Sequence, residues 1–168
     1  KILDEHRGLG FSLLDLDDGQ TRFTLNLKPR AGGGAAGAVV HTPGLPKLLV
    51  VAEGERTVTA VDLVSGEVRW RHTLRRPGTY RVRRAGKLLL VAGDSVLVAL
   101  DVASGEVVWR LRERLPFTGD VAVDHDSAFA ILGSANAARL LMLDPWSGEV
   151  GWSAEIDERP AAGQPPLL

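Results

Sequence analysis

Short apolar runs recur along this chain, and residues that favour turns separate them. Three of the runs, Leu48–Ala52, Leu88–Ala92 and Ala128–Leu132, contain no polar residue. A strand with one face in water alternates apolar and polar side chains, whereas a strand buried on both faces is apolar throughout. The three runs therefore predict strands that are covered on both faces. Glycine and β-branched residues interrupt every candidate helix, so the pattern predicts an all-β fold.

Other stretches alternate. Between residues 68 and 74, Val68 and Trp70 share one face of an extended strand, and Arg69 and Arg71 share the other. Such a strand has one solvated face, as the outermost strand of a sheet would.

The clearest complete unit combines both patterns into a four-stranded antiparallel meander. Turn residues at Ala85-Gly86, Gly93-Asp94 and Ser104-Gly105 separate its strands. The four strands are predicted at residues 80–84, 87–92, 95–101 and 106–112.

A ten-residue pattern occurs four times: an apolar residue, Asp, two residues, Ser or Asp, Gly, three residues, and Trp or Phe. Copies spaced at roughly 40 residues indicate a repeat architecture, and four-stranded units that stack radially are the blades of a β-propeller. The defining residues are Asp15, Gly19 and Phe23; Asp62, Gly66 and Trp70; Asp101, Gly105 and Trp109; and Asp144, Gly148 and Trp152.

The repeat divides the chain into blades of one propeller domain. We expect full blades at residues 38–74, 75–112 and 113–156, about three in all. Residues 1–27 are expected to form a partial blade and residues 157–168 to begin a further one, with a glycine-rich linker at 28–37. The prediction is a partial propeller that continues beyond this sequence.

The physical chemistry of the motif points to a structural role. Asp followed by Ser-Gly forms a tight hairpin turn in which Gly adopts positive φ. Tryptophan buries a large apolar area, and its indole N–H needs an acceptor. We therefore predict that the motif residues join neighbouring blades, rather than bind a cofactor or a metal.

At this point the chain resembles a known family. The pattern Ala-x-Asp-x-x-(Ser/Thr)-Gly-x-x-x-Trp is similar to the pyrroloquinoline-quinone (PQQ) type propeller repeat with its tryptophan docking motif. Ala60–Trp70 and Ala99–Trp109 match it closely. Met142 replaces the Ala in the last copy, and Leu13 and Phe23 replace the Ala and Trp in the first.

The resemblance implies a bacterial protein in the periplasm or another extracytoplasmic location. It also implies a ring of more blades than this chain holds. Because a half ring leaves apolar blade faces uncovered, we expect it to be completed by remaining blades of the same chain, by a second copy or by a protein partner.

The family that the chain resembles includes enzymes, so the chain could also be part of an enzyme, and the sequence can be compared with what such enzymes need. Quinoprotein dehydrogenases in the family need a tryptophan floor, often a vicinal disulfide, and a calcium site built from Glu, Asn and Asp. This chain has no Cys and no acidic cluster outside the turn motifs. We predict a non-catalytic scaffold or protein-interaction domain without a cofactor. The alternatives are a PQQ-dependent dehydrogenase and a ligand-sensing or outer-membrane assembly propeller.

Charge and histidine add one candidate contact. A net charge of −1 gives no reason to expect nucleic acid, and no apolar run approaches the length of a membrane span. Arg81 and Arg83 point the same way from the expected innermost strand, where they could bind an anion or an acidic partner, or pair with a nearby carboxylate. The four histidines, His6, His41, His72 and His125, lack metal-ligand spacing, and residues 124–126 are expected to form a turn.

Overall fold

The computed structural model describes residues 9–14, 17–27, 36–41, 44, 46–133 and 138–156. This part of the chain holds fourteen strands and no helix, and the strands form one two-stranded and three four-stranded antiparallel sheets. The first two sheets contain β1 (Leu9–Leu14) and β2 (Thr21–Leu27), then β3 (Ala36–Val40), β4 (Leu48–Glu53), β5 (Thr57–Asp62) and β6 (Val68–Thr73). The third contains β7 (Arg81–Ala85), β8 (Leu88–Ala92), β9 (Val96–Asp101) and β10 (Val107–Arg112), and the fourth β11 (Ala122–Val123), β12 (Ala128–Gly133), β13 (Ala138–Leu143) and β14 (Val150–Ile156).

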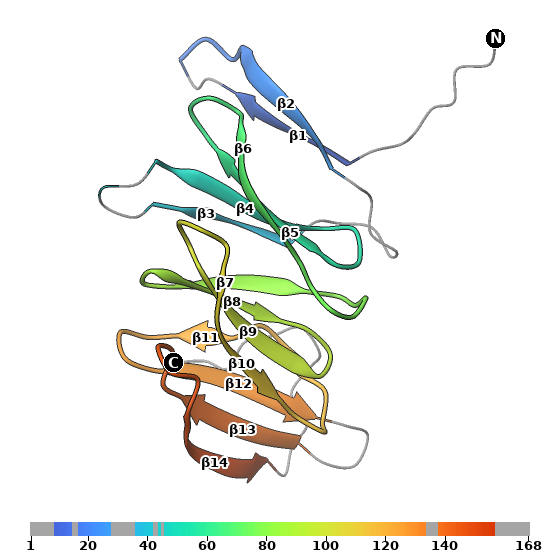
Figure 1. The fold of residues 1–168 in the computed structure, drawn as a ribbon, viewed down its shortest axis with the longest axis vertical. Coiled ribbons are helices and arrows are strands. Elements are labelled where there is room, and N and C mark those ends of the chain that lie inside the picture. Colours follow the sequence, from blue (N-terminus) through green and yellow to red (C-terminus); the bar gives the residue numbers. More distant parts are fainter. Residues whose placement is uncertain are drawn as a thin grey trace, which may run out of the picture.

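Each four-stranded sheet is a meander in which sequence neighbours pair. The sheets stack face to face in sequence order along the long axis of the molecule (Figure 1). Strand β7 lies beside β3 and β11, so the first strands of consecutive sheets are neighbours. Contact between first strands is the arrangement of propeller blades around a central axis. The predicted fold class, an all-β partial propeller, is confirmed.

The middle strands are buried on both faces, as their apolar runs predict. In β8, Leu89 and Val91 face the sheet of β3–β6, whereas Leu88 and Leu90 face the sheet of β11–β14. Strand β9 divides its side chains in the same way. Burying a Leu or Val side chain contributes about 1.5–3 kcal/mol, so the two layers between sheets are a main source of stability.

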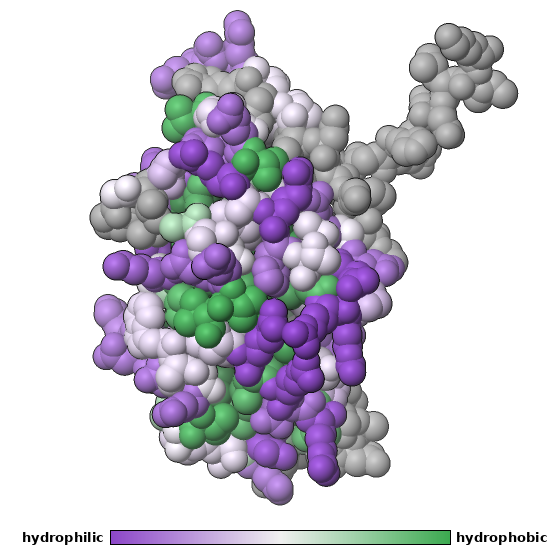
Figure 2. Space-filling model, viewed as in Figure 1, coloured by the Kyte–Doolittle hydropathy of each residue, from purple (hydrophilic) through white to green (hydrophobic). Residues whose placement is uncertain are grey.

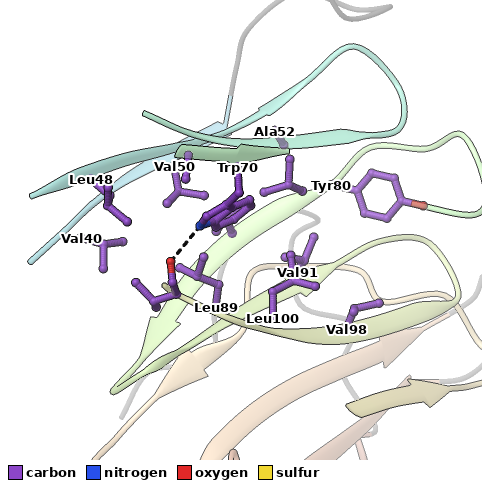
Figure 3. Close-up of a cluster of buried hydrophobic side chains, with 14 of the residues drawn as sticks. Val40, Leu48, Val50, Ala52, Trp70, Tyr80, Leu89, Val91, Val98 and Leu100 are labelled. Atoms are coloured by element: carbon purple, nitrogen blue, oxygen red, sulfur yellow. Dashed lines mark hydrogen bonds between the residues drawn. The ribbon is translucent and has the colours of Figure 1, made fainter. Parts of the chain in front are cut away.

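The layer between β3–β6 and β7–β10 has an aromatic residue at its centre. Trp70 lies between Val50 and Ala52 of its own sheet and Leu89 and Leu100 of the next (Figure 3). Its side chain is 9% exposed. The layer thus combines aliphatic packing with the Trp70 ring, which reaches from one sheet to the next, and with the buried ring of Tyr80.

The outer strands alternate between buried and solvated residues. In β6, Trp70 is buried while Arg69 and Arg71 on either side are exposed. On the face seen in Figure 2, hydrophobic side chains appear between strongly hydrophilic ones. Strand β14 differs because almost all of it is exposed, including Trp152 at 44%. No described sheet lies beyond β14 to cover it.

Some of the segments expected from the sequence lie partly or wholly outside the described residues. Strand β3 begins at Ala36, within the range expected for the glycine-rich linker. Most of that linker and the expected further blade at 157–168 lie outside the described residues. Within the described residues, none forms a helix suited to crossing a membrane.

Candidate functional site

The repeated Asp organises each hairpin turn through its side chain. The Asp101 Oδ1 atom accepts hydrogen bonds from the backbone N–H groups of Ala103 and Ser104, both at 2.9 Å. The N–H of Gly105 donates to the Asp101 carbonyl at 2.9 Å, and Gly105 has a φ of +72°. A positive φ is inexpensive only for glycine, which explains why this position of the repeat is glycine.

The same turn recurs at Asp62 and Asp144. Asp62 Oδ1 accepts from the N–H groups of Val64 and Ser65, and Asp144 Oδ1 accepts from the two corresponding residues of its own turn. These backbone hydrogen bonds, helped by nearby Arg69, hold the pKa of Asp62 below its usual value. The three carboxylates are therefore engaged by their own turns. The glycines share the geometry, with φ of +70° at Gly19 and +75° at Gly66 and Gly148.

A bulge precedes the aromatic position in each copy. The register shifts between Ala60 and Val61 where β5 pairs with β6, and Arg69 is left without a partner across the ladder. Equivalent shifts occur where β9 meets β10, where β13 meets β14, and where β1 meets β2. A bulge bends its strand and redirects the next side chain, so the fixed spacing between Gly and Trp includes this extra residue.

The tryptophans connect each sheet to the turn of the next. The Nε1–H of Trp70 donates to the carbonyl of Val102, and that of Trp109 donates to the carbonyl of Pro145, both at 2.9 Å. Each acceptor follows a motif Asp directly in the chain. The ring also covers the motif glycine, because a Cβ atom built on Gly105 would lie 2.5 Å from the Trp70 ring.

The contact repeats at the next interface. A Cβ atom on Gly148 would lie 2.6 Å from the Trp109 ring. Glycine is therefore required twice in this turn, once for its positive φ and once for the close approach of a ring from the neighbouring sheet.

The two ends of the repeat differ from its middle. Trp152 is 44% exposed, and its ring meets Phe129 of its own sheet at a centroid distance of 6.3 Å. At the other end, a Cβ atom on Gly19 would meet nothing within 4 Å. Asp15 lies outside the described residues, and Phe23 lies in β2, with its side chain among those not described.

One contact between sheets is not encoded in the repeat. Trp146 packs on Gly86, which has a φ of +57°, in the β7–β8 turn of the preceding sheet. Only the last copy of the motif carries a tryptophan at this position, so comparison of the copies gives no signal for the contact. The one sequence feature that points to this contact is the presence of a large aromatic residue in a turn.

Arg81 and Arg83 lie in β7 and both reach one carboxylate. Arg81 Nε is 3.6 Å from Asp120 Oδ1, and Arg83 Nη2 is 2.9 Å from Asp120 Oδ2. Asp120 precedes β11, so the pairs bridge two neighbouring sheets near their first strands. An external anion would have to compete with Asp120 for both guanidinium groups.

The described histidines are not gathered at one place. His41 and His125 are exposed, and His125 pairs with Asp124 at 3.0 Å in the turn between β11 and β12. No group of three or more His, Cys, Asp or Glu side chains suited to a metal ion exists among the described residues. His6 lies outside them.

His72 lies in β6, between two sheets. Its Nε2 atom is buried and has no hydrogen-bond partner in the described part of the chain. Burial, followed by the positive charge of Arg110, lowers the pKa of His72 below its usual value. The folded protein therefore favours the neutral ring.

This environment predicts a pH dependence of stability. Between the lowered pKa and the ordinary value of about 6.5, the unfolded chain binds more protons at this position than the folded chain. The free energy of unfolding should therefore fall as pH falls below about 6.5. In His72→Gln the decline between pH 7.5 and pH 5 should be smaller, as measured by urea unfolding. Equal declines in both proteins would contradict the assignment.

Three stacked four-stranded meanders, joined by a repeated turn and a repeated tryptophan, define a partial β-propeller of PQQ-type repeats. The family model described as outer membrane protein assembly factor BamB matches residues 11–164. The chain belongs to this family. No curated protein matches it.

Solved structures with the same fold include both assembly factors and enzymes. BamB from Moraxella catarrhalis is 19% identical with a TM-score of 0.64, and the alignment covers 87% of this chain and 44% of that one. A europium-containing methanol dehydrogenase is 18% identical with a TM-score of 0.59, covering 77% of this chain and 25% of that one. The designed Ika8 protein is 13% identical with a TM-score of 0.69, and the alignment covers 94% of this chain and 46% of that one. The chain thus spans less than half the length of these proteins.

Proposed function

We propose that this chain is part of a non-catalytic propeller that binds protein partners during outer-membrane protein assembly in the bacterial periplasm. The observation that carries the proposal is the family match over residues 11–164. Propellers commonly present their loops for binding while the sheets remain structural.

In this proposal the repeated residues form a tryptophan docking motif. Each motif Trp fixes the angle between two blades by binding the turn of the next blade, as the contacts of Trp70 and Trp109 support. A scaffold needs such rigidity because binding loops on different blades must keep their relative positions. The loops that vary between copies would then carry the partner contacts.

The proposal also accounts for the uncovered motif residues of the first and last described sheets. Trp152 is exposed, and the turn at Gly19 has free space where a ring would pack. Further blades, from the same chain or from a second copy, would cover these two features in a complete ring. A propeller of about twice this length is the form in which the scaffold would work.

Deletion of the protein in its native host tests the proposal. The amount of folded outer-membrane β-barrel proteins should fall, and expression of the intact protein should restore it. Expression of an unrelated propeller of similar size serves as the control. Unchanged levels of every outer-membrane β-barrel protein after deletion would contradict the proposed function.

A quinoprotein dehydrogenase is the second candidate, because the fold is shared with a methanol dehydrogenase and with the quinohemoprotein alcohol dehydrogenase of Comamonas testosteroni. The residues do not fit this role. The chain has no Cys for a vicinal disulfide, and both Trp70 and Trp109 are covered by turn glycines. The carboxylates of Asp62, Asp101 and Asp144 are held within their turns.

The enzyme alternative has a direct test. The purified protein, incubated with pyrroloquinoline quinone and Ca²⁺, should neither retain the quinone absorbance after gel filtration nor reduce a dye with alcohols. Retained absorbance together with calcium-dependent dye reduction would establish the dehydrogenase and exclude the scaffold.

A further inference from the structure

A groove lies between the second and third sheets, and its lining comes from both. It has a volume of about 710 Å³, within the range of roughly 300–1,000 Å³ typical of ligand sites. Leu74, Val96 and Val98 supply apolar surface, and Tyr80 lies beside them. The groove is at the ends of β6 and β10, where the β6–β7 connection passes the β8–β9 turn.

Four arginines line this groove. Arg75 and Arg76 come from the β6–β7 connection, and Arg110 and Arg112 come from β10, so the cluster forms only when the two sheets stack. All four are exposed, and none forms an ion pair with a described residue. Asp94 and Glu113 are the carboxylates of the lining. Four positive and two negative side chains give the groove a net charge of +2.

Other arginines of the same sheets do have carboxylate partners. Arg69 lies 3.2 Å from Asp62, and Arg71 lies 3.6 Å from Glu53. Asp120 pairs with Arg81 and Arg83 of β7. The groove therefore differs from these sites because its four guanidinium groups have no carboxylate partner among the described residues and are gathered around one hollow.

The backbone that carries Arg75 and Arg76 is held in place. The side chain of Arg56 donates to the carbonyls of Leu74 at 3.1 Å and Arg75 at 2.8 Å. The Tyr80 hydroxyl donates to the Arg76 carbonyl at 2.7 Å. Arg110 and Arg112 lie in a paired strand. A ligand would thus meet guanidinium groups on an ordered backbone, which lowers the entropic cost of binding.

We infer that this groove binds an acidic segment of a protein partner. Guanidinium groups bind carboxylates through paired N–H···O hydrogen bonds, and four of them on two sheets call for several carboxylates along one segment. The apolar lining favours a segment in which apolar residues alternate with acidic ones. The inference rests on the proposed function, because it assumes that the propeller binds proteins.

Fluorescence anisotropy of the full chain with a labelled hexapeptide of alternating glutamate and valine tests the inference. The matched probe has glutamine in place of glutamate. We expect the glutamate peptide to bind, and to bind more weakly as salt is raised from 50 to 300 mM, because salt screens charge pairs. The glutamine peptide should bind at least about tenfold more weakly, since charge-assisted hydrogen bonds are lost. Equal binding of both peptides would overturn the inference.

Two groove variants and one control locate the site. Arg110→Ala/Arg112→Ala and Arg75→Ala/Arg76→Ala should each weaken binding about tenfold or more. Arg81→Ala/Arg83→Ala removes the same charge from arginines already paired with Asp120, so its affinity should stay within about twofold. Thermal unfolding checks that each variant folds. If one of the two groove variants does not fold, the other still tests the site. Loss of binding only in Arg81→Ala/Arg83→Ala would move the site to β7 and overturn the inference.

Competition distinguishes other anions from a peptide. Inorganic phosphate or phosphatidylglycerol vesicles that displace the probe better than unlabelled peptide would overturn the inference in favour of a simple anion site or a membrane surface. In the deletion strain, groove variants that restore outer-membrane proteins fully would also overturn it, while leaving the proposed function intact. A deletion without effect would instead remove the proposed function.

Discussion

Gly105→Ala is expected to lower the free energy of unfolding by about 2–5 kcal/mol. A left-handed backbone costs a non-glycine residue about 1–2 kcal/mol, and Gly105 has a φ of +72°. The new methyl group would also lie 2.5 Å from the Trp70 ring. Forcing a close-packed ring to move costs about 1–3 kcal/mol. Chemical denaturation followed by circular dichroism measures the sum.

Gly19→Ala is the matched control for this prediction. Gly19 occupies the same place in the repeat, with a φ of +70°, but a Cβ atom there meets nothing within 4 Å. The control should therefore show only the backbone cost of about 1–2 kcal/mol. If both variants lost the same free energy, the ring contact at Gly105 would have no energetic role.

Trp70→Ala is expected to destabilise the chain by about 3–5 kcal/mol, the range for a large aromatic residue removed from a core. The side chain is 9% exposed and packs against residues of two sheets. Its removal leaves a cavity between the sheets, and the Val102 carbonyl loses its indole donor. The melting temperature and the free energy of unfolding both report the loss.

Hydrogen exchange gives this prediction a spatial readout. In Trp70→Ala, amides of β6 and of the turn after β9 should exchange faster, because the contact between their sheets is lost. The turn after β13 contacts Trp109 instead and should change less. A loss of protection confined to β6 would contradict the claim that Trp70 connects two neighbouring sheets.

The repeated parts of the fold could be predicted from the sequence. Apolar runs such as Leu88–Ala92 identify strands that contribute side chains to two layers, and the structure confirms this division. The Asp and Gly of each turn are likewise readable, because few residues favour a tight turn with positive φ. These features are local, so the order of residues specifies them.

Contacts between sheets were harder to predict. Arg75, Arg76, Arg81 and Arg83 form one basic stretch in the sequence, yet the structure separates them. Asp120, well downstream in the chain, pairs with the last two, and β10 brings two further arginines beside the first two. Trp146 on Gly86 is a further contact between distant segments. Such contacts depend on how the sheets stack. The sequence of a single repeat does not specify that stacking.

The central claim is that the motif tryptophan acts between blades rather than within its own blade. The most direct measurement compares the free energies of unfolding of Trp70→Ala and Trp152→Ala, at a protein concentration where sedimentation shows a monomer. The two residues hold the same place in the repeat, but Trp152 is 44% exposed and no described sheet follows it. We predict a loss of about 3–5 kcal/mol for Trp70→Ala and a much smaller loss for Trp152→Ala. Equal losses would show that the tryptophan stabilises its own blade and would contradict the account.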